Sequence, residues 1–195
     1  FLILGLGTLI GLDPLVSQAF GAGRPRDCGE TYQRGLVLAA ILTVPTIAIF
    51  ALAEPALLLL GEPAALSARG ASYVHALIPG VLPFYVFVAT RQFIQGLGMM
   101  RPAMFVAIAA NVVNAAANWV LIWGHLGFPA LGSTGSGIAT SFARFFLAGA
   151  ILVFVARSPA LKPYPWRPTR AAFAPRPLLA LFRGSFTVGL QYGIE

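Results

Sequence analysis

Long apolar stretches separated by short polar segments make up most of this sequence of 195 residues. A membrane-crossing helix needs about 20 mostly apolar residues, because a hydrocarbon core roughly 30 Å thick is traversed at about 1.5 Å per residue. The stretches that fit or begin to fit this length are 1–20, 36–60, 71–90, 103–123, 136–156 and a last one that starts near Leu178. Each complete stretch is about twice as long as a barrel strand and lacks strict alternation. The sequence therefore predicts an all-α, polytopic transmembrane helix bundle.

The composition favours lipid rather than water as the main surroundings of this chain. Hydrophobic residues make up 58% of it and charged residues 10%, whereas a soluble protein carries about 25% charged residues. The net charge of +7 comes from basic residues between the apolar stretches, without a stripe of interleaved aromatics, which argues against nucleic-acid binding. The single cysteine, Cys28, has no intramolecular partner, which excludes an internal disulfide and a cysteine-based metal cluster.

Basic residues are distributed unevenly between the two sides that alternating spans would define. Most of the 13 Lys and Arg residues fall in loops on one side, among them Arg24, Arg26, Arg34, Arg91, Arg101 and Lys162. The opposite side has Arg69, and Arg144 falls inside the fifth stretch. Because loops rich in Lys and Arg remain in the cytoplasm, the sequence places this basic side there, with the chain in the inner (plasma) membrane.

Proline marks two kinds of position. Pro45, Pro55, Pro79 and Pro83 lie inside apolar stretches, where we expect bends with the freed carbonyls bonded by neighbouring helices or water. The segment 158–177 combines many prolines with basic residues, so it predicts an extended linker. We therefore expect five spans within 1–157, a cytoplasmic linker over 158–177 and the start of a second unit over 178–195.

Several short motifs occur in a fixed order along the chain. They are Leu-Asp-Pro-Leu-Val-Ser-Gln-Ala-Phe-Gly-Ala-Gly at 12–23, Tyr-Gln-Arg-Gly at 32–35, Arg-Gln-Phe-Ile-Gln-Gly at 91–96 with Arg-Pro at 101–102, the run 111–132, and Gly-Ser-Gly-Ile-Ala-Thr at 135–140. Together they resemble the MATE (multidrug and toxic compound extrusion) family. The resemblance extends over the whole chain and aligns it with that family's second to sixth helices and the start of the seventh.

This resemblance implies a twelve-helix protein of two six-helix lobes, connected by the proline-rich linker. The first helix and most of the second lobe would lie outside this sequence, and both ends of the chain are expected inside spans. A piece of this extent is not expected to transport by itself, and the full-length protein is expected to be monomeric.

Glu195 is the first candidate for a functional site, because the tail 189–195 resembles the family's seventh helix, whose glutamate contributes to cation binding. A carboxylate in a dry cavity can exchange a proton or hold Na⁺ with other oxygen ligands. The alternative is an ordinary carboxylate at a helix end. Thr187 stands where the family commonly has proline, which weakens the expected kink.

Asn114 and Asn118 are the second candidate, since residues four apart share one face of a helix. Their carbonyl oxygens can coordinate a cation or accept a hydrogen bond, and they match the family's polar pair on the fifth helix. The alternative is an amide contact that holds helices together. Thr140 could add a hydroxyl group to this site, whereas Asn111 is out of register and is predicted to be structural. No metal is firmly assigned; Na⁺ at Glu195 or at this pair is the candidate.

Other polar residues carry weaker indications. Asp13 is a candidate binding residue within the 12–23 motif, with bonding to backbone N–H groups or to Arg34 as the alternative. Glu54 is predicted to reach water near the outer end of its span. The role of Arg144 stays open. His75 and His125 lack a ligand-spaced partner, and the cluster Gly132, Gly135 and Gly137 predicts close helix packing rather than phosphate binding.

The function that these features favour is secondary active export of amphipathic, often cationic drug-like compounds in exchange for Na⁺ or H⁺. No cofactor other than the coupling ion is expected, the partners are the small-molecule substrate and membrane lipids, and no set of residues indicates an enzyme. One alternative is a flippase for lipid or polysaccharide precursors, which would need a strongly cationic cavity. The other is a membrane scaffold without transport activity.

Overall fold

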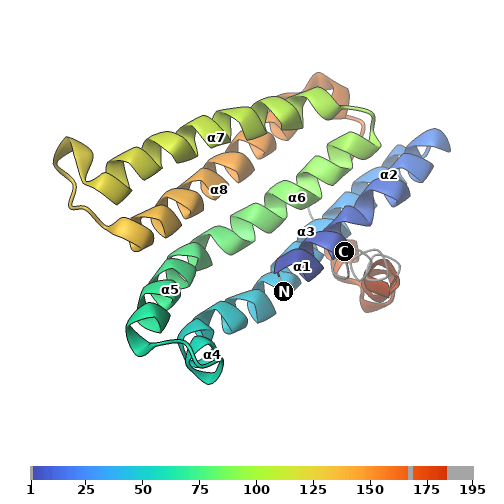
Figure 1. Ribbon diagram of the computed structural model, residues 1–195. Coiled ribbons are helices and arrows are strands. Elements are labelled where there is room, and N and C mark those ends of the chain that lie inside the picture. Colours follow the sequence, from blue (N-terminus) through green and yellow to red (C-terminus); the bar gives the residue numbers. More distant parts are fainter. Residues whose placement is uncertain (1, 167–168, 184–195) are drawn as a thin grey trace.

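A computed structural model describes residues 2–166 and 169–183 of the chain (Figure 1). Within these ranges the protein is helical and contains no strand. The α-helices are α1 (Leu2–Ile10), α2 (Leu12–Gly21), α3 (Pro25–Ala51), α4 (Ala53–Leu59), α5 (Ala64–Leu77), α6 (Val81–Gly96), α7 (Met100–Trp123) and α8 (Gly132–Arg157), and residues 175–183 are also helical. The 3₁₀ helices are η1 (Ile78–Gly80), η2 (His125–Gly127), η3 (Pro159–Leu161) and η4 (Arg170–Phe173).

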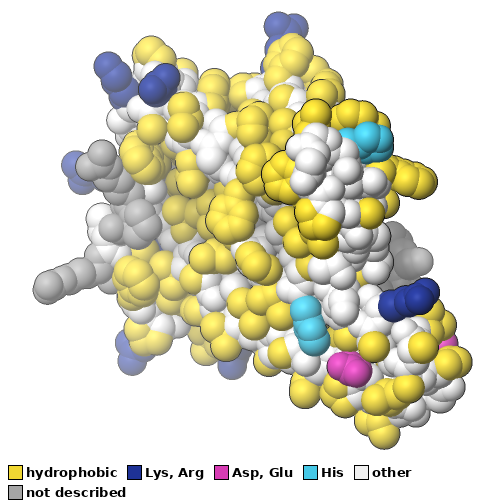
Figure 2. All heavy atoms as spheres, turned by 90° about the vertical axis from the view of Figure 1, so that its left-hand side faces the viewer, with side chains coloured by type: hydrophobic (Ala, Val, Ile, Leu, Met, Phe, Trp, Pro, Cys, Tyr) yellow, Lys and Arg dark blue, Asp and Glu magenta, His cyan; other side chains and the backbone are white. Residues whose placement is uncertain are grey.

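Four helical segments in the described part are long and apolar enough to cross a membrane. They are Pro25–Ala51, Ala64–Gly96, Met100–Trp123 and Gly132–Arg157. These segments contain the predicted stretches 71–90, 103–123 and 136–156 and most of 36–60, which confirms a polytopic all-α fold. Hydrophobic side chains also dominate the face of the molecule seen in Figure 2, where carboxylates are rare.

The first apolar stretch forms two helices, α1 and α2, of 9 and 10 residues instead of one span. Pro14 explains the interruption at Gly11, because its ring has no N–H and would collide with the carbonyl four residues earlier, at Ile10. That freed carbonyl accepts a hydrogen bond of 3.2 Å from Nε2 of Gln92 in α6. A neighbouring helix thus compensates for the proline.

The helix α3 begins at Pro25, well before the predicted start at Leu36. Proline at the first helical position and Asp27 in the first turn are both favourable at a helix N-terminus. Arg34 therefore lies in α3 and not in the loop where the sequence placed it, and Cys28 lies in the same helix.

A second interruption separates α3 from α4. Pro55 frees the carbonyl of Ala51 in the same way, and Nε2 of His75 in α5 lies 3.4 Å from that oxygen. Glu54 is exposed and lies in the first turn of α4.

The third interruption, η1, contains Pro79 and separates α5 from α6. Oγ of Ser141 in α8 donates a hydrogen bond of 2.6 Å to the carbonyl of Ala76 beside this break. The sequence predicts bends at the prolines inside the apolar stretches; at Pro79 the structure has a break over 78–80, whereas Pro45 and Pro83 lie inside α3 and α6. The break also brings the middle of α8 against the start of α6.

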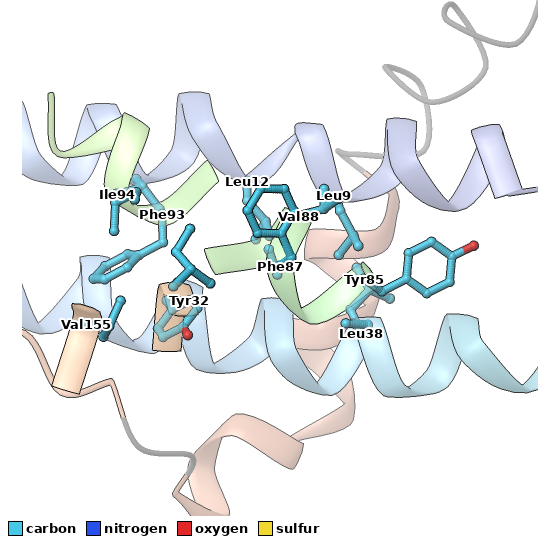
Figure 3. Close-up of a cluster of buried hydrophobic side chains, with 14 of the residues drawn as sticks. Leu9, Leu12, Tyr32, Leu38, Tyr85, Phe87, Val88, Phe93, Ile94 and Val155 are labelled. Atoms are coloured by element: carbon cyan, nitrogen blue, oxygen red, sulfur yellow. The ribbon is translucent and has the colours of Figure 1, made fainter. Parts of the chain in front are cut away.

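A buried cluster fills the space where α1, α2, α3 and α6 meet (Figure 3). The rings of Tyr32 and Phe93 stack with centroids 4.4 Å apart, and the Tyr32 hydroxyl lies 3.0 Å from Oγ1 of Thr90. Leu9 and Leu12 are almost fully buried in the same cluster. The helix α6 contributes to this cluster and also packs against α8, which runs beside α7 in Figure 1.

Two glycines in α8 allow close packing with neighbouring helices, as the sequence predicted. A Cβ atom on Gly135 would lie 2.5 Å from the Leu121 carbonyl oxygen in α7. A Cβ atom on Gly137 would lie 2.7 Å from the Tyr73 carbonyl oxygen in α5. Gly132 is different: no atom crowds it, but its φ of +56° favours glycine.

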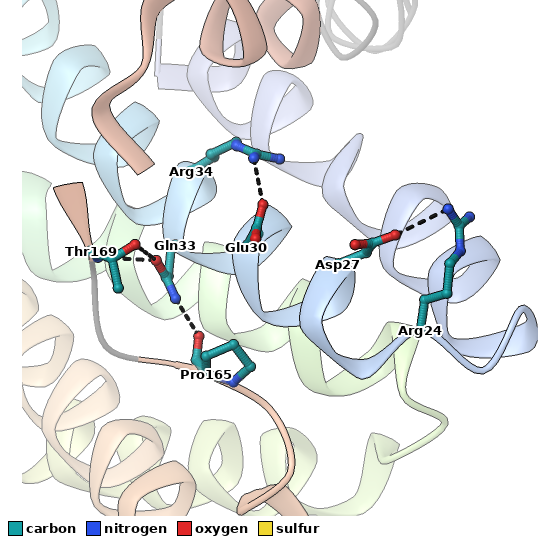
Figure 4. Close-up of polar contacts among 7 residues, drawn as sticks. All are labelled: Arg24, Asp27, Glu30, Gln33, Arg34, Pro165 and Thr169. Carbon is teal, nitrogen blue, oxygen red and sulfur yellow. Dashed lines mark hydrogen bonds and ion pairs between the residues drawn. The ribbon is translucent and has the colours of Figure 1, made fainter. Parts of the chain in front are cut away.

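The proline-rich segment after α8 folds back onto α3 (Figure 4). Nε2 of Gln33 donates to the Pro165 carbonyl at 2.6 Å, while the N–H and hydroxyl of Thr169 donate to Oε1 of Gln33 at 3.0 and 2.9 Å. The Pro165 ring packs where Gly29 has no side chain. Burial raises the pKa of the Tyr164 hydroxyl, whose ring meets Phe93 edge-on. In its described part the segment is therefore docked, not extended.

Replacing Gln33 with leucine should loosen this docked segment. The three lost hydrogen bonds contribute about 1 kcal/mol each, about 3 kcal/mol together, so we expect trypsin to cleave after Arg170 roughly 100-fold faster. Gel electrophoresis of the full-length protein in detergent measures the rate, and Gln18→Leu on the exposed face of α2 is the control. Equal cleavage rates in Gln33→Leu and the unsubstituted protein would contradict the proposed docking role of Gln33.

Candidate functional site

A cavity of about 310 Å³ lies between α6, α7 and α8. Phe84 and Phe87 of α6 provide apolar walls. The polar lining comes from the other two helices, and consists of Asn111, Asn114, Thr140 and Arg144. Because α7 and α8 are both candidate spans and these residues lie near the middle of each, the polar groups lie at membrane depth.

The two asparagines form a hydrogen-bonded pair along α7. Nδ2 of Asn118 donates to Oδ1 of Asn114 at 2.9 Å, as their spacing of four residues allows. Oδ1 of Asn118 is buried and has no hydrogen-bond partner. A buried acceptor without a partner is rare in folded proteins, so this oxygen can accept a bond from a ligand or coordinate a cation.

Thr140 lies across the cavity from this pair, on α8. Its hydroxyl donates to the Ser136 carbonyl at 2.9 Å, which leaves lone pairs on the hydroxyl oxygen for a further contact. The structure therefore brings Asn114 and Thr140 to one cavity, with Asn118 one turn further along α7. Asn111 also lines it but is exposed.

Arg144 is the charged group of this cavity, and sequence reasoning left it out of the site. Its guanidinium carbon lies 4.8 Å from the centre of the Phe84 ring, and Nη1 is buried without a hydrogen-bond partner. The signal for it was present in the sequence, since an arginine in the middle of an apolar stretch indicates a functional role.

The remaining candidates do not join this cavity. Asp13 lies in the first turn of α2 and accepts a hydrogen bond of 3.2 Å from Oγ of Ser17. The suggested contact with Arg34 is absent, because Arg34 pairs with Glu30 at 2.7 Å (Figure 4). Glu195 falls outside the described residues.

Neither histidine takes part in a metal site within the part of the chain that the structure describes. His75 contacts the Ala51 carbonyl, as described above. The His125 ring stacks on Trp119 with centroids 4.0 Å apart, and its Nδ1 lies 2.8 Å from the Trp119 carbonyl oxygen. Both rings therefore have structural contacts at helix ends.

The sequence of this chain is similar to a family of known proteins and to several of its members. Residues 1–120 match the model of the MatE family. The chain is 30% identical over 194 residues to the multidrug resistance protein NorM of Vibrio cholerae, covering all of this chain and 42% of that protein. It is 37% identical over 142 residues to a probable multidrug resistance protein NorM of Mesorhizobium japonicum, covering 72% of this chain and 30% of that protein.

Two solved structures share the fold. The eukaryotic MATE transporter AtDTX14 superposes with a TM-score of 0.87 at 17% identity, and an inward-facing multidrug resistance MATE family transporter with 0.84 at 18% identity. The first covers 98% of this chain, which in turn covers 42% of that structure. The observed helices therefore form an incomplete lobe of this fold, as the sequence predicted.

Proposed function

Because this chain belongs to the MATE family of membrane transporters, we propose that it is part of a secondary active exporter of amphipathic, cationic drug-like compounds. As the sequence predicts, the chain belongs to a multi-pass membrane protein. The family comprises transporters and not enzymes, which also agrees with the prediction from the sequence. The names of its relatives refer to multidrug resistance, which supports small drug-like molecules as the substrates of the full-length protein.

The unpartnered Oδ1 of Asn118 carries this proposal. This oxygen belongs to the residue one helical turn from Asn114, which lines the cavity together with Thr140, and it is of the kind that Na⁺ accepts as a ligand. Cation binding would stabilise the conformation that releases substrate outward, and loss of the cation to the cytoplasm would reset the protein. The ion gradient then supplies the free energy for export.

The cavity residues also bear on the choice of coupling ion. Amide and hydroxyl groups do not bind a proton near neutral pH, so proton coupling requires a titratable group such as a carboxylate or an imidazole, and neither His75 nor His125 lines this cavity. The sequence contains 6 acidic residues, and Asp13, Asp27, Glu30, Glu54 and Glu62 do not line this cavity. Within this sequence, Glu195 is then the candidate for carrying a proton, and the asparagine pair is the candidate for binding Na⁺.

A flippase for lipid or polysaccharide precursors is less well supported. Pyrophosphate recognition would require several basic groups, and in the described part of the chain Arg144 is the one basic side chain that lines the cavity. The apolar walls formed by Phe84 and Phe87 favour an amphipathic ligand instead.

Efflux from vesicles that contain the full-length protein tests this function. Ethidium loaded on the cytoplasmic side should be exported when an inward gradient of Na⁺ or of protons is imposed, and imposing each gradient alone identifies the coupling ion. Vesicles without protein give the background rate. Ethidium movement that depends on neither gradient would exclude cation-coupled export.

A further inference from the structure

Arg144 occupies a costly position for a charge. It lies near the middle of α8, a helix of 26 residues, so about 18 Å of helix separates it from either end. Arginines at such depth almost always face the protein interior or a water-filled cavity, and they pair with an opposite charge or with carbonyl groups. An arginine retained here therefore requires a partner.

The side chain of Arg144 is held in place by the break between α5 and α6. A Cβ atom on Gly80 would lie 2.9 Å from Cδ of Arg144 and 2.9 Å from Oγ of Ser141, so the absence of a side chain at Gly80 makes room for the stem. The guanidinium group then reaches the face of the Phe84 ring and the cavity. The stem of the side chain is positioned by packing beside Gly80 and Ser141, and the guanidinium makes a cation–π contact with Phe84.

No described residue neutralises this charge. The ion pairs found in the described ranges join Arg24 to Asp27 and Arg34 to Glu30. The titratable side chains that interact with Arg144 are the phenols of Tyr73 and Tyr85, and no carboxylate is among them. Nη1 is buried without a hydrogen-bond partner, so this nitrogen of the guanidinium lacks an acceptor among the described residues.

We propose that Arg144 binds a carboxylate group in the cavity between α6, α7 and α8. The planar guanidinium donates two parallel hydrogen bonds to a carboxylate, a geometry that lysine does not reproduce. The adjacent Phe84 and Phe87 would contact an apolar body attached to that carboxylate.

This inference rests on the proposed export function and defines its substrates more narrowly. If the carboxylate belongs to the transported molecule, the protein prefers amphipathic compounds that carry an acidic group as well as a cationic one. The same chemistry could come from an acidic side chain of the full-length protein outside the described residues. In both cases the positive charge of Arg144 binds the carboxylate.

Two dyes that differ in one group distinguish these sources. Rhodamine B carries a free carboxylate, and its ethyl ester carries the same cationic ring system without that charge. Transport of both dyes by the full-length protein in vesicles is measured for Arg144→Gln, which removes the charge, and Arg144→Lys, which keeps it. Arg69→Gln, an exposed arginine of α5, is the matched control.

For a carboxylate on the substrate, Arg144→Gln should raise the KM for rhodamine B about tenfold, because a charge-assisted hydrogen bond is lost, and change that for the ester less than about twofold. Arg144→Lys should recover part of the loss. For a carboxylate of the protein itself, Arg144→Gln should impair both dyes equally and Arg144→Lys should restore both.

The proposal is overturned if the Gln and Lys variants both transport the two dyes with the KM values of the unsubstituted protein, because neither the charge nor the guanidinium geometry would then have a role. If both variants are inactive, the binding measurement below decides. If the unsubstituted protein exports neither dye, the proposed function fails separately. Fluorescence anisotropy of rhodamine B with the detergent-solubilised variants then still tests the carboxylate contact, which predicts weaker binding to Arg144→Gln than to the unsubstituted protein and to Arg144→Lys. Equal binding to all three would overturn it.

Discussion

Gly137→Val should strongly destabilise the full-length protein. A Cβ atom at this position would lie 2.7 Å from the Tyr73 carbonyl oxygen and 2.6 Å from Cβ of Ala76, and backbone atoms of a packed helix cannot move aside as a flexible side chain can. Separating α8 from α5 should cost roughly 3 kcal/mol. It would also break the hydrogen bond from Ser141 to Ala76. Size-exclusion chromatography in detergent should show loss of the monodisperse peak, and the remaining material should have a lower Tm.

Gly149→Val provides the matched control for this effect. It introduces the same side chain into the same helix, but nothing lies within 4 Å of a Cβ atom there. Its elution profile and Tm should resemble those of the unsubstituted protein. A normal peak and an unchanged Tm for Gly137→Val would show that the close contact between α5 and α8 is not required.

Asn118→Leu is expected to have the largest effect on coupling. Leucine has a similar volume but removes both the bond to Asn114 and the buried, unpartnered Oδ1. If that oxygen is a Na⁺ ligand, its loss should raise the Na⁺ concentration needed for half-maximal ethidium efflux by about tenfold or more, a typical effect for a group that supports a bound cation.

Val112→Leu is the control for this substitution, because Val112 lies on the outward apolar face of the same helix and is 66% exposed. Its dependence on Na⁺ should remain that of the unsubstituted protein. An Asn118→Leu protein with normal Na⁺ dependence would remove the asparagine pair from the coupling site.

Hydropathy alone predicted most of the fold, because lipid-facing helices must be apolar over a length set by the bilayer. Hydropathy did not predict the helix boundaries that depend on single residues. Pro14 divides the first stretch, and the favourable first turn at Pro25 extends α3 into a segment polar enough to resemble a loop. Both signals were present in the sequence, but a hydropathy average conceals them.

Contacts between distant residues could not be read from the sequence. The hydrogen bonds of Gln33 with Pro165 and Thr169 join positions more than 100 residues apart, and proline content alone suggested an extended chain. For the same reason the unpartnered nitrogen of Arg144 could not be foreseen, because it follows from the positions of three different helices.

For the candidate site, sequence spacing correctly placed Asn114 and Asn118 on one helical face, since that relation is local. Thr140 reaches the same cavity only because the glycines of α8 allow close packing with its neighbours. Asp13 was predicted as a binding residue because it lies in a matching motif, but it does not line the cavity and accepts a hydrogen bond from Ser17 of its own helix. Local periodicity was thus a better guide than motif membership.

The central claim is that the cavity between α6, α7 and α8 lies on the path of the substrate. Cysteine labelling tests it directly: Thr140→Cys in a Cys28→Ala background of the full-length protein places a thiol in the cavity lining, and Ser17→Cys on the exposed side of α2 is the control. With ethidium at about ten times its Kd, labelling at position 140 should slow about tenfold, because few sites remain open, while labelling at position 17 stays constant. Equal labelling rates at position 140 with and without ethidium would contradict the claim.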